Sequence, residues 1–391
     1  MPAGSGNRNA CNSGLPLESH NLTVTQQTIN KLFSNSYAEA REKFLAAAAA
    51  KGLSVDSYEL PLRGTDGETL ATDVVLDGPN GASNLLIVIS GCHGVEGYCG
   101  SAIQTGLLEV APDPKDRVDA ANTAVLYVHA VNPYGFSHTR RATQENVDLN
   151  RNFVDFSTAL PDNPGYAEIH DLLLPPEWPP RSENEARLST FRDQVGARGF
   201  QRAVSLGQYG FEDGLHFGGT APTWSNETFR KILRKYAATS RHIASIDIHT
   251  GLGPFGVGER IFAAPENPVT LDRSRRWWGD NLTSVSTGTS SSIPLTGPIQ
   301  ASFSQECPQA VQTNVCLEFG TYPMEEVIHA MRGEHWLHRY GCTDAPKRDS
   351  IKAALKRAFY PQREDWNLAA WVQGREVYLQ SLNGLRRNAD E

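Results

Sequence analysis

Short apolar runs that end in polar, glycine-containing segments constrain the fold of this chain more than any other sequence feature. One run covers residues 84–90 and another covers 124–131, and a helix-forming segment at 101–108 separates them. Strands that alternate with helices predict a mixed, largely parallel central sheet with helices on both faces. In such a sheet, ligands bind beyond the carboxyl ends of the strands. We therefore expect an α/β fold in which segments distant in sequence meet at one edge of the sheet.

Two apolar runs of this kind, at residues 84–90 and 243–248, are followed by residues of the types that bind zinc. His93 and Glu96 stand three residues apart in a glycine-rich segment directly after the run at 84–90, and His249 comes directly after residues 243–248. Zinc in a hydrolase typically takes three protein ligands of the His and Glu types and keeps a fourth position open for water. The sequence therefore predicts a zinc site made of His93, Glu96 and His249.

Two further segments carry charged side chains in an apolar context. Residues 146–153 read Asn-Val-Asp-Leu-Asn-Arg-Asn-Phe, and Val147 and Leu149 alternate in them with Asp148 and Asn150. In a strand, this alternation would put the two polar residues on one face. The planar fork of an arginine matches a carboxylate, so this segment predicts carboxylate binding. The second segment is the apolar strand at 315–320, where a lone acid such as Glu318 needs a partner or a chemical role.

The order of these motifs resembles the zinc carboxypeptidases of the carboxypeptidase A type and their relatives, the succinylglutamate desuccinylase and aspartoacylase branch. The resemblance runs from about residue 80 to about residue 325, and residues 148–153 are its most specific part. Segments 217–225 and 251–256 further suggest a distinct carboxypeptidase-like subfamily. The resemblance implies that His93, Glu96 and His249 are the zinc ligands and that Glu318 is the catalytic glutamate.

The same resemblance assigns roles to the residues around the zinc ligands. It implies that Asn150 and Arg151 bind a terminal carboxylate of the substrate, and that Arg141, or alternatively Arg140, polarises the scissile carbonyl. It also implies that Asp148 orients the first histidine ligand. Asp247 is a further candidate, because a ligating histidine usually donates its other N–H to a carboxylate or carbonyl. The alternative for both acids is that they only stabilise the fold.

One departure from the family pattern concerns a tyrosine. In carboxypeptidases, a tyrosine from a mobile loop between the second histidine ligand and the glutamate covers the substrate, but residues 250–317 contain no tyrosine. Tyr209 and Tyr322 are the candidates to replace it.

These motifs predict a zinc-dependent hydrolase of an amide bond, either a metallocarboxypeptidase or an N-acyl amino acid deacylase. Its partner is a small-molecule or peptide substrate with a free carboxylate. The first alternative is a non-catalytic carboxylate-binding or scaffold protein that retains the fold. The second is a dinucleotide-binding oxidoreductase, because residues 251–256 match G-x-G-x-x-G after a strand. Pro254, Gly256 and Gly258 make a poor helix start there, which disfavours the oxidoreductase.

Length and composition limit the remaining possibilities. The chain has 391 residues, a net charge of −8 without long runs of one sign, and six scattered cysteines. This predicts no nucleic-acid partner, no disulfide scaffold and no structural zinc ribbon. Because no apolar run approaches a signal-peptide core or a membrane span, we expect a cytoplasmic protein with no membrane partner. The predicted organisation is a disordered tail at 1–24, a catalytic domain at 25–343 and a C-terminal helical extension packed on it at 344–391.

Overall fold

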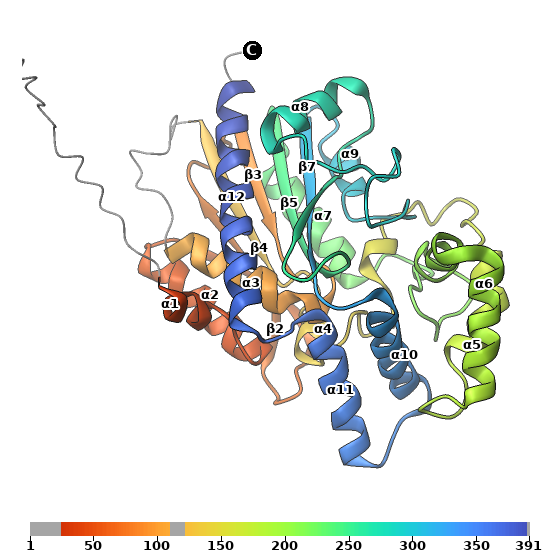
Figure 1. Cartoon of the computed structure of the whole chain (residues 1–391). Helices are drawn as coiled ribbons and strands as arrows, with labels where there is room; N and C mark the ends of the chain where they lie inside the picture. Colours follow the sequence, from red (N-terminus) through yellow and green to blue (C-terminus); the bar gives the residue numbers. More distant parts are fainter. Residues whose placement is uncertain (1–24, 110–121, 389–391) are drawn as a thin grey trace, which may run out of the picture.

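The computed structural model describes residues 25–109 and 122–388 (Figure 1). The tail predicted at residues 1–24 lies outside the described residues. Within the described ranges, seven strands form one sheet in the order β1-β2-β4-β3-β5-β7-β6. Their bounds are β1 Val55–Arg63, β2 Thr69–Asp77, β3 Asn84–Ile89, β4 Thr123–His129, β5 His242–Gly251, β6 Gly258–Phe262 and β7 Val311–Gly320.

The four central strands run parallel to one another. β3 pairs in parallel with β4 and β5, and β5 pairs in parallel with β7. Antiparallel partners flank them, namely β1 and β2 beside β4, and β6 beside β7. The predicted mixed, largely parallel sheet is therefore confirmed.

Helices cover both faces of this sheet. The helices and helical turns are α1 Gln26–Leu32, α2 Tyr37–Ala50, η1 Gly94–Glu96, α3 Gly97–Glu109, α4 Pro133–Ser137, η3 Leu149–Arg151, α5 Pro164–Leu173, α6 Ser182–Ser205, α7 Trp224–Tyr236, α8 Pro268–Trp278, α9 Ala301–Glu306, α10 Met324–Tyr340, α11 Ala345–Phe359 and α12 Glu364–Asn388. On one face, α12 packs against β3 and β5 and α3 packs against β4 and β5, with α1, α2 and α8 beside them. On the other face lie α7 and α9.

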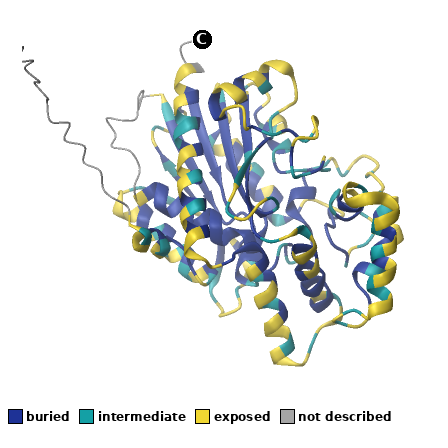
Figure 2. Cartoon of the chain, in the orientation of Figure 1, coloured by how far each residue is buried: buried dark blue, intermediate teal, exposed yellow. Residues whose placement is uncertain are grey.

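The apolar runs are continuous because both faces of the central strands are buried. In β3, Leu86 and Val88 belong to the core under α3 and α12, whereas Leu85, Ile87 and Ile89 belong to the core under α7 and α9. Figure 2 shows the central strands buried and the outer faces of α6, α11 and α12 exposed.

A separate apolar cluster lies beside the sheet. It is formed by α5, α6, α10 and α11, and residues from all four helices pack together in it. Figure 1 shows these helices beyond one end of β5 and β7. This cluster therefore supplies a wall on the side of the sheet where the predicted site residues gather.

Two local predictions have different outcomes. The capping-box spacing of Ser36 and Glu39 predicts a helix that stops near Gly52. This helix is α2, whose N-cap Ser36 accepts a hydrogen bond from the Glu39 backbone, and Gly52 follows it at a φ of 67°. The many prolines of residues 160–183 predict a loop or insertion. This prediction is wrong in part, because α5 occupies Pro164–Leu173. Asn163 caps this helix and Pro164 sits in its first turn, where a missing N–H costs nothing.

The C-terminal helices α11 and α12 pack on the rest of the chain, α11 in the cluster beside the sheet and α12 across α3 and the central strands. The domain boundary at residue 343 stays a prediction. No helix in the described ranges is long and apolar enough to cross a membrane.

Candidate metal centre and active site

The residues predicted to bind zinc and the predicted catalytic residue Glu318 meet at the carboxyl ends of three strands. His93 follows β3 and caps the helical turn η1, which contains Glu96. His249 lies near the end of β5, directly opposite Glu318 in the neighbouring strand β7. Parallel strands end at the same edge of a sheet, so four residues spread over 226 positions of the chain converge there.

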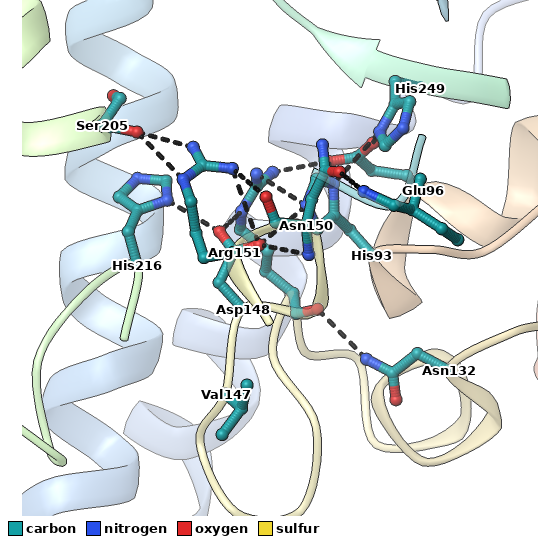
Figure 3. Close-up of polar contacts among 12 residues, drawn as sticks. His93, Glu96, Asn132, Val147, Asp148, Asn150, Arg151, Ser205, His216 and His249 are labelled. Atoms are coloured by element: carbon teal, nitrogen blue, oxygen red, sulfur yellow. Dashed lines mark hydrogen bonds and ion pairs between the residues drawn. The ribbon is translucent and has the colours of Figure 1, made fainter. Parts of the chain in front are cut away.

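The three candidate ligands present their donor atoms to one point (Figure 3). The Nδ1 atoms of His93 and His249 are 3.2 Å apart. His93 Nδ1 lies 2.8 Å from Glu96 Oε1, and His249 Nδ1 lies 2.9 Å from Glu96 Oε2. All donor atoms of the set lie within 4.8 Å of one another, and all three residues are buried.

The opposite nitrogen of each ring faces an aspartate. His93 Nε2 lies 3.1 Å from Asp148 Oδ1, and His249 Nε2 lies 2.7 Å from Asp247 Oδ2. The Asp247 carboxylate at His249 Nε2 favours the tautomer that carries its proton there, which leaves a lone pair on Nδ1. His93 Nε2 faces both the Asp148 carboxylate and, at 2.8 Å, the Arg141 Nη2 donor. The Nδ1 atoms of both histidines and the Glu96 carboxylate face each other in a buried space. The residues present therefore fit a divalent cation such as zinc.

Each of these aspartates also contacts an uncharged or histidine side chain that lines the pocket. His216 Nδ1 lies 2.8 Å from Asp148 Oδ2, and Gln300 donates a hydrogen bond of 2.8 Å to Asp247 Oδ2. Burial alone would raise the pKa of Asp148, but the positive charges of Arg141 and Arg151 hold that pKa well below its usual range. Asp148 is therefore a carboxylate. His216 and Gln300 are not among the residues singled out from the sequence.

The structure places the two adjacent arginines differently. Arg141 lines the pocket and donates hydrogen bonds to Glu96 (2.7 Å) and Asp148 (3.1 Å). Arg140 donates instead to Glu334 of α10 at 2.8 Å and to Asn146 at 2.7 Å. Of the two candidates, Arg141 is the one near the ligand set.

The segment predicted to bind a carboxylate also lines the pocket, but it is not a strand. Residues 149–151 form the helical turn η3, which Asp148 caps. The alternation of Val147 and Leu149 with Asp148 and Asn150 is therefore not strand periodicity. Asn150 Oδ1 accepts a hydrogen bond from the Ile299 backbone, which leaves the Asn150 amide nitrogen for a ligand. Arg151 donates to the carbonyl oxygens of Ser205 and Asn150.

Glu318 lies in a setting that favours its neutral form. It lines the pocket and is 8% exposed, and one carboxylate oxygen accepts a hydrogen bond of 2.9 Å from the Leu252 backbone. Burial, together with the negative charge of Glu96, raises the pKa of Glu318 to about 7. A carboxyl group with a pKa near neutrality suits both acceptance and donation of a proton.

The loop between α8 and α9 closes one side of the pocket. Arg198 of α6 donates hydrogen bonds to the carbonyl oxygens of Ser290, Ser291 and Ser292, and the Gln201 side chain also donates to Ser291. The segment occupies the stretch of chain in which the carboxypeptidase tyrosine would stand. Neither Tyr209 nor Tyr322 is among the described residues that line the pocket.

The glycine motif at 251–256 does not open a helix. β5 ends at Gly251 and β6 begins at Gly258, so the motif is a turn between two strands of the sheet. This arrangement does not match the dinucleotide-binding motif, which requires a helix at this position.

Comparisons with known proteins give one family and several remote structural relatives. The model of a family described as "Protein of unknown function (DUF2817)" matches residues 33–373. No curated protein sequence matches the chain. Among solved structures, the chain is similar to carboxypeptidase A from Helicoverpa armigera, with 12% identity, 95% of this chain and 78% of that chain covered, and a TM-score of 0.47.

Two further structures belong to the same comparison. Bovine thrombin-activatable fibrinolysis inhibitor is 10% identical over 84% of this chain and 96% of that chain, with a TM-score of 0.42. An aspartoacylase family protein from Mesorhizobium loti is 14% identical over 75% of this chain and 68% of that chain, with a TM-score of 0.32. The two branches named from the sequence motifs, carboxypeptidase and aspartoacylase, are thus both represented among these structures.

Proposed function

We propose that this chain, which belongs to the DUF2817 family, catalyses the zinc-dependent hydrolysis of an amide bond in a carboxylate-bearing substrate. This is the function that its site supports best. The protein would act as a metallocarboxypeptidase or as a deacylase of N-acyl amino acids. The observation that carries this proposal is the convergence of the His93 and His249 Nδ1 atoms on Glu96, with Glu318 and Arg141 in the same pocket.

His93, Glu96 and His249 would hold the metal ion. Zinc bound there would polarise the scissile carbonyl and lower the pKa of a water molecule. The pairs formed by His93 with Asp148 and by His249 with Asp247 hold both imidazoles in the orientation that ligation requires, and Asp247 also favours the required tautomer of His249.

Glu318 is the proposed general base and acid. It takes one proton from the attacking water and passes it to the leaving nitrogen, while the hydroxyl of the water stays on the carbonyl carbon. The amide C–N bond breaks, and the products are a carboxylic acid and an amine. Arg141 donates hydrogen bonds to the oxyanion that develops on the carbonyl oxygen.

Asn150 and Arg151 are the proposed binding residues for the substrate's carboxylate. Arg151 is 2% exposed, and backbone carbonyl oxygens hold its guanidinium in place. An arginine held in this way loses little side-chain freedom when it binds an anion.

Replacement of the proposed base tests the mechanism. Glu318→Gln nearly preserves the shape of the side chain and removes the proton acceptor. We expect the variant to keep its zinc and its melting temperature and to lose about 10²–10⁴-fold in kcat. The measurement is steady-state hydrolysis of N-acyl amino acids and short peptides, with zinc content as the control. Turnover within a few-fold of the wild-type rate would exclude Glu318 as the base.

A further inference from the structure

Besides residues 261–264 of β6 and the segment after it, the apolar lining of the pocket includes two walls on different structural supports. Its volume is about 480 Å³. The loop wall is formed by residues of the α8–α9 loop, namely Val285, Ile293, Pro294, Leu295 and Pro298. The helix wall is formed by Met324, Val327, Ile328 and Met331 of α10 and by Phe359 of α11. The α10 residues are spaced three and four apart, which puts them on one face of the helix.

The loop wall lies beside the proposed carboxylate-binding residues. The Ile299 backbone donates a hydrogen bond of 2.9 Å to Asn150. Gly297 is so close to Arg151 that an added Cβ would lie 2.5 Å from the Arg151 carbonyl oxygen. The half of a substrate that bears the carboxylate would therefore contact the loop wall.

The helix wall lies beside the proposed reacting groups. The Cζ atom of Arg141 is 6.0 Å from the centre of the Phe359 ring. A Cβ added to Gly251 would lie 3.0 Å from Phe359 and 3.8 Å from a carboxylate oxygen of Glu318. Phe359 belongs to the same apolar cluster as Val327, Ile328 and Met331. The wall therefore begins at the place where the scissile carbonyl would bind.

We propose that the helix wall is a binding subsite for an uncharged aliphatic or aromatic acyl group, so that the substrates are N-acyl amino acids with apolar acyl chains. This inference rests on the proposed function, because the orientation of the substrate follows from the roles of Arg141, Asn150 and Arg151. Burial of an acyl chain against Val327, Ile328 and Met331 removes apolar surface from water. The two methionines allow the wall to fit acyl chains of different shapes.

The distribution of charge favours an acyl group over the free α-amino group of a dipeptide. The acidic side chains among the described residues that line the pocket are Glu96, Glu318 and Glu266. The first two belong to the reacting groups, and Glu266 contacts Ser286 of the loop. An ammonium group on the helix wall would lose its water without a carboxylate partner, which is costly.

The experiment compares acyl chains of increasing length on one amino acid. The substrates are N-acetyl, N-butanoyl, N-hexanoyl and N-octanoyl leucine. Leucyl-leucine, which carries a free ammonium group, is the comparison substrate. We expect kcat/KM of the zinc-loaded protein to rise roughly fourfold for each added methylene until the wall is covered, as for burial of a CH₂ group. Leucyl-leucine should be cleaved less well than N-hexanoyl leucine, which has a similar size.

A matched pair of variants separates the two walls. Val327→Thr and Val285→Thr both keep the shape of the side chain and replace one methyl group with a hydroxyl. We expect Val327→Thr to reduce the preference for N-octanoyl over N-acetyl leucine about 3- to 10-fold. Val285→Thr, on the loop wall, should keep that preference. An equal change in both variants would overturn the assignment of the acyl group to the helix wall.

Binding to the Glu318→Gln protein distinguishes failure of the subsite from failure of the proposed function. Calorimetry gives the affinity for each acyl amino acid without turnover. Hydrolysis of the series with affinities and rates that do not depend on chain length would overturn the subsite and leave the proposed function standing. Affinities that rise with chain length, with no hydrolysis by the wild-type protein, would support the subsite and refute the proposed function.

Discussion

At the scale of single residues, Arg151 offers the sharpest test of substrate recognition. We expect Arg151→Ala to lower kcat/KM about 10- to 100-fold for substrates with a free carboxylate, because a charge-assisted hydrogen bond to that group is lost. The corresponding amides, which lack that group, should change far less. The measurement is the ratio of the two losses in one variant. An equal loss for both substrate classes would mean that Arg151 is structural.

His216 shows what sequence analysis at this scale missed and why. A lone histidine carries no motif, and its relevance depends on a chain reversal that brings residue 216 back to Asp148. The backbone makes this contact through the hydrogen bond from Asp148 N to the carbonyl oxygen of Phe217, at 2.7 Å. By contrast, His93, Glu96, Asp148, Asn150 and Arg151 stand in short motifs, and the spacing of those motifs indicated their association before the fold was known.

At the scale of structural elements, the α8–α9 loop connects the two halves of the site. The Ile299 backbone donates a hydrogen bond to Asn150. The next residue, Gln300, donates one to Asp247, whose carboxylate contacts Nε2 of the candidate ligand His249. The Asp247 carboxylate is fully buried, and its Oδ1 atom has no hydrogen-bond partner within the described ranges. The orientation of Asp247 therefore depends on the two groups that contact Oδ2.

We expect Gln300→Leu to weaken zinc binding about 10- to 100-fold, the typical effect of losing a partner behind a metal ligand. The measurement is competition with a chelator of known affinity. Gln309→Leu is the matched control, because Gln309 is exposed and, among the described residues, its side chain makes one hydrogen bond, to the Ala238 carbonyl oxygen. Equal zinc affinities for the two variants would show that Gln300 does not position His249.

The elements differ in how far the sequence predicts them. The strands and α2 follow from apolar runs and a capping residue, which are local properties. The turn η3 could not be predicted in this way, because alternation over four residues does not distinguish a strand from a turn. Helix α5 could not be predicted either, because the prolines that follow it at residues 175–180 make the whole segment look like a loop. No local pattern marks Gln300, whose contact with Asp247 depends on the path of a long loop.

At the scale of the whole molecule, buried histidines predict how stability depends on pH. Burial lowers the pKa of His129 to about 4 and the pKa of His335 to about 3, below the usual value of about 6.5. The folded state then binds fewer protons than the unfolded state as the pH falls below about 6.5. The free energy of unfolding should therefore decrease from there towards pH 4 and below, by up to about 1.4 kcal/mol per pH unit for each histidine.

His129→Gln tests this dependence away from the proposed site. Glutamine can keep the hydrogen bond that His129 makes with Ser101 at 2.9 Å, but it does not titrate. Urea unfolding at several values between about pH 7 and pH 4 should show a shallower decrease for the variant than for the wild-type protein. Identical slopes would mean that His129 does not contribute to acid unfolding.

The overall architecture and the zinc-binding hypothesis share one physical origin, because both depend on parallel strands that end at the same edge of the sheet. His93, Glu96 and His249 could be predicted together since each lies near or shortly after the carboxyl end of a strand. The walls of the pocket come from α10, α11 and a long loop, whose positions depend on packing between distant segments, and so the sequence alone did not predict the substrate's apolar part.

Metal content tests the central claim most directly. The protein is purified without an affinity tag, dialysed against buffer with a trace of zinc, and measured by mass spectrometry beside a His93→Ala, His249→Ala double variant. We expect about one tightly bound zinc ion per chain in the wild-type protein, because the donor atoms of His93, Glu96 and His249 lie within 4.8 Å of one another, and the other such group among the described residues, Cys92, Asp247 and His249, shares His249 with that set. The double variant should bind none while remaining folded. One zinc ion per chain persisting in the double variant would contradict the account.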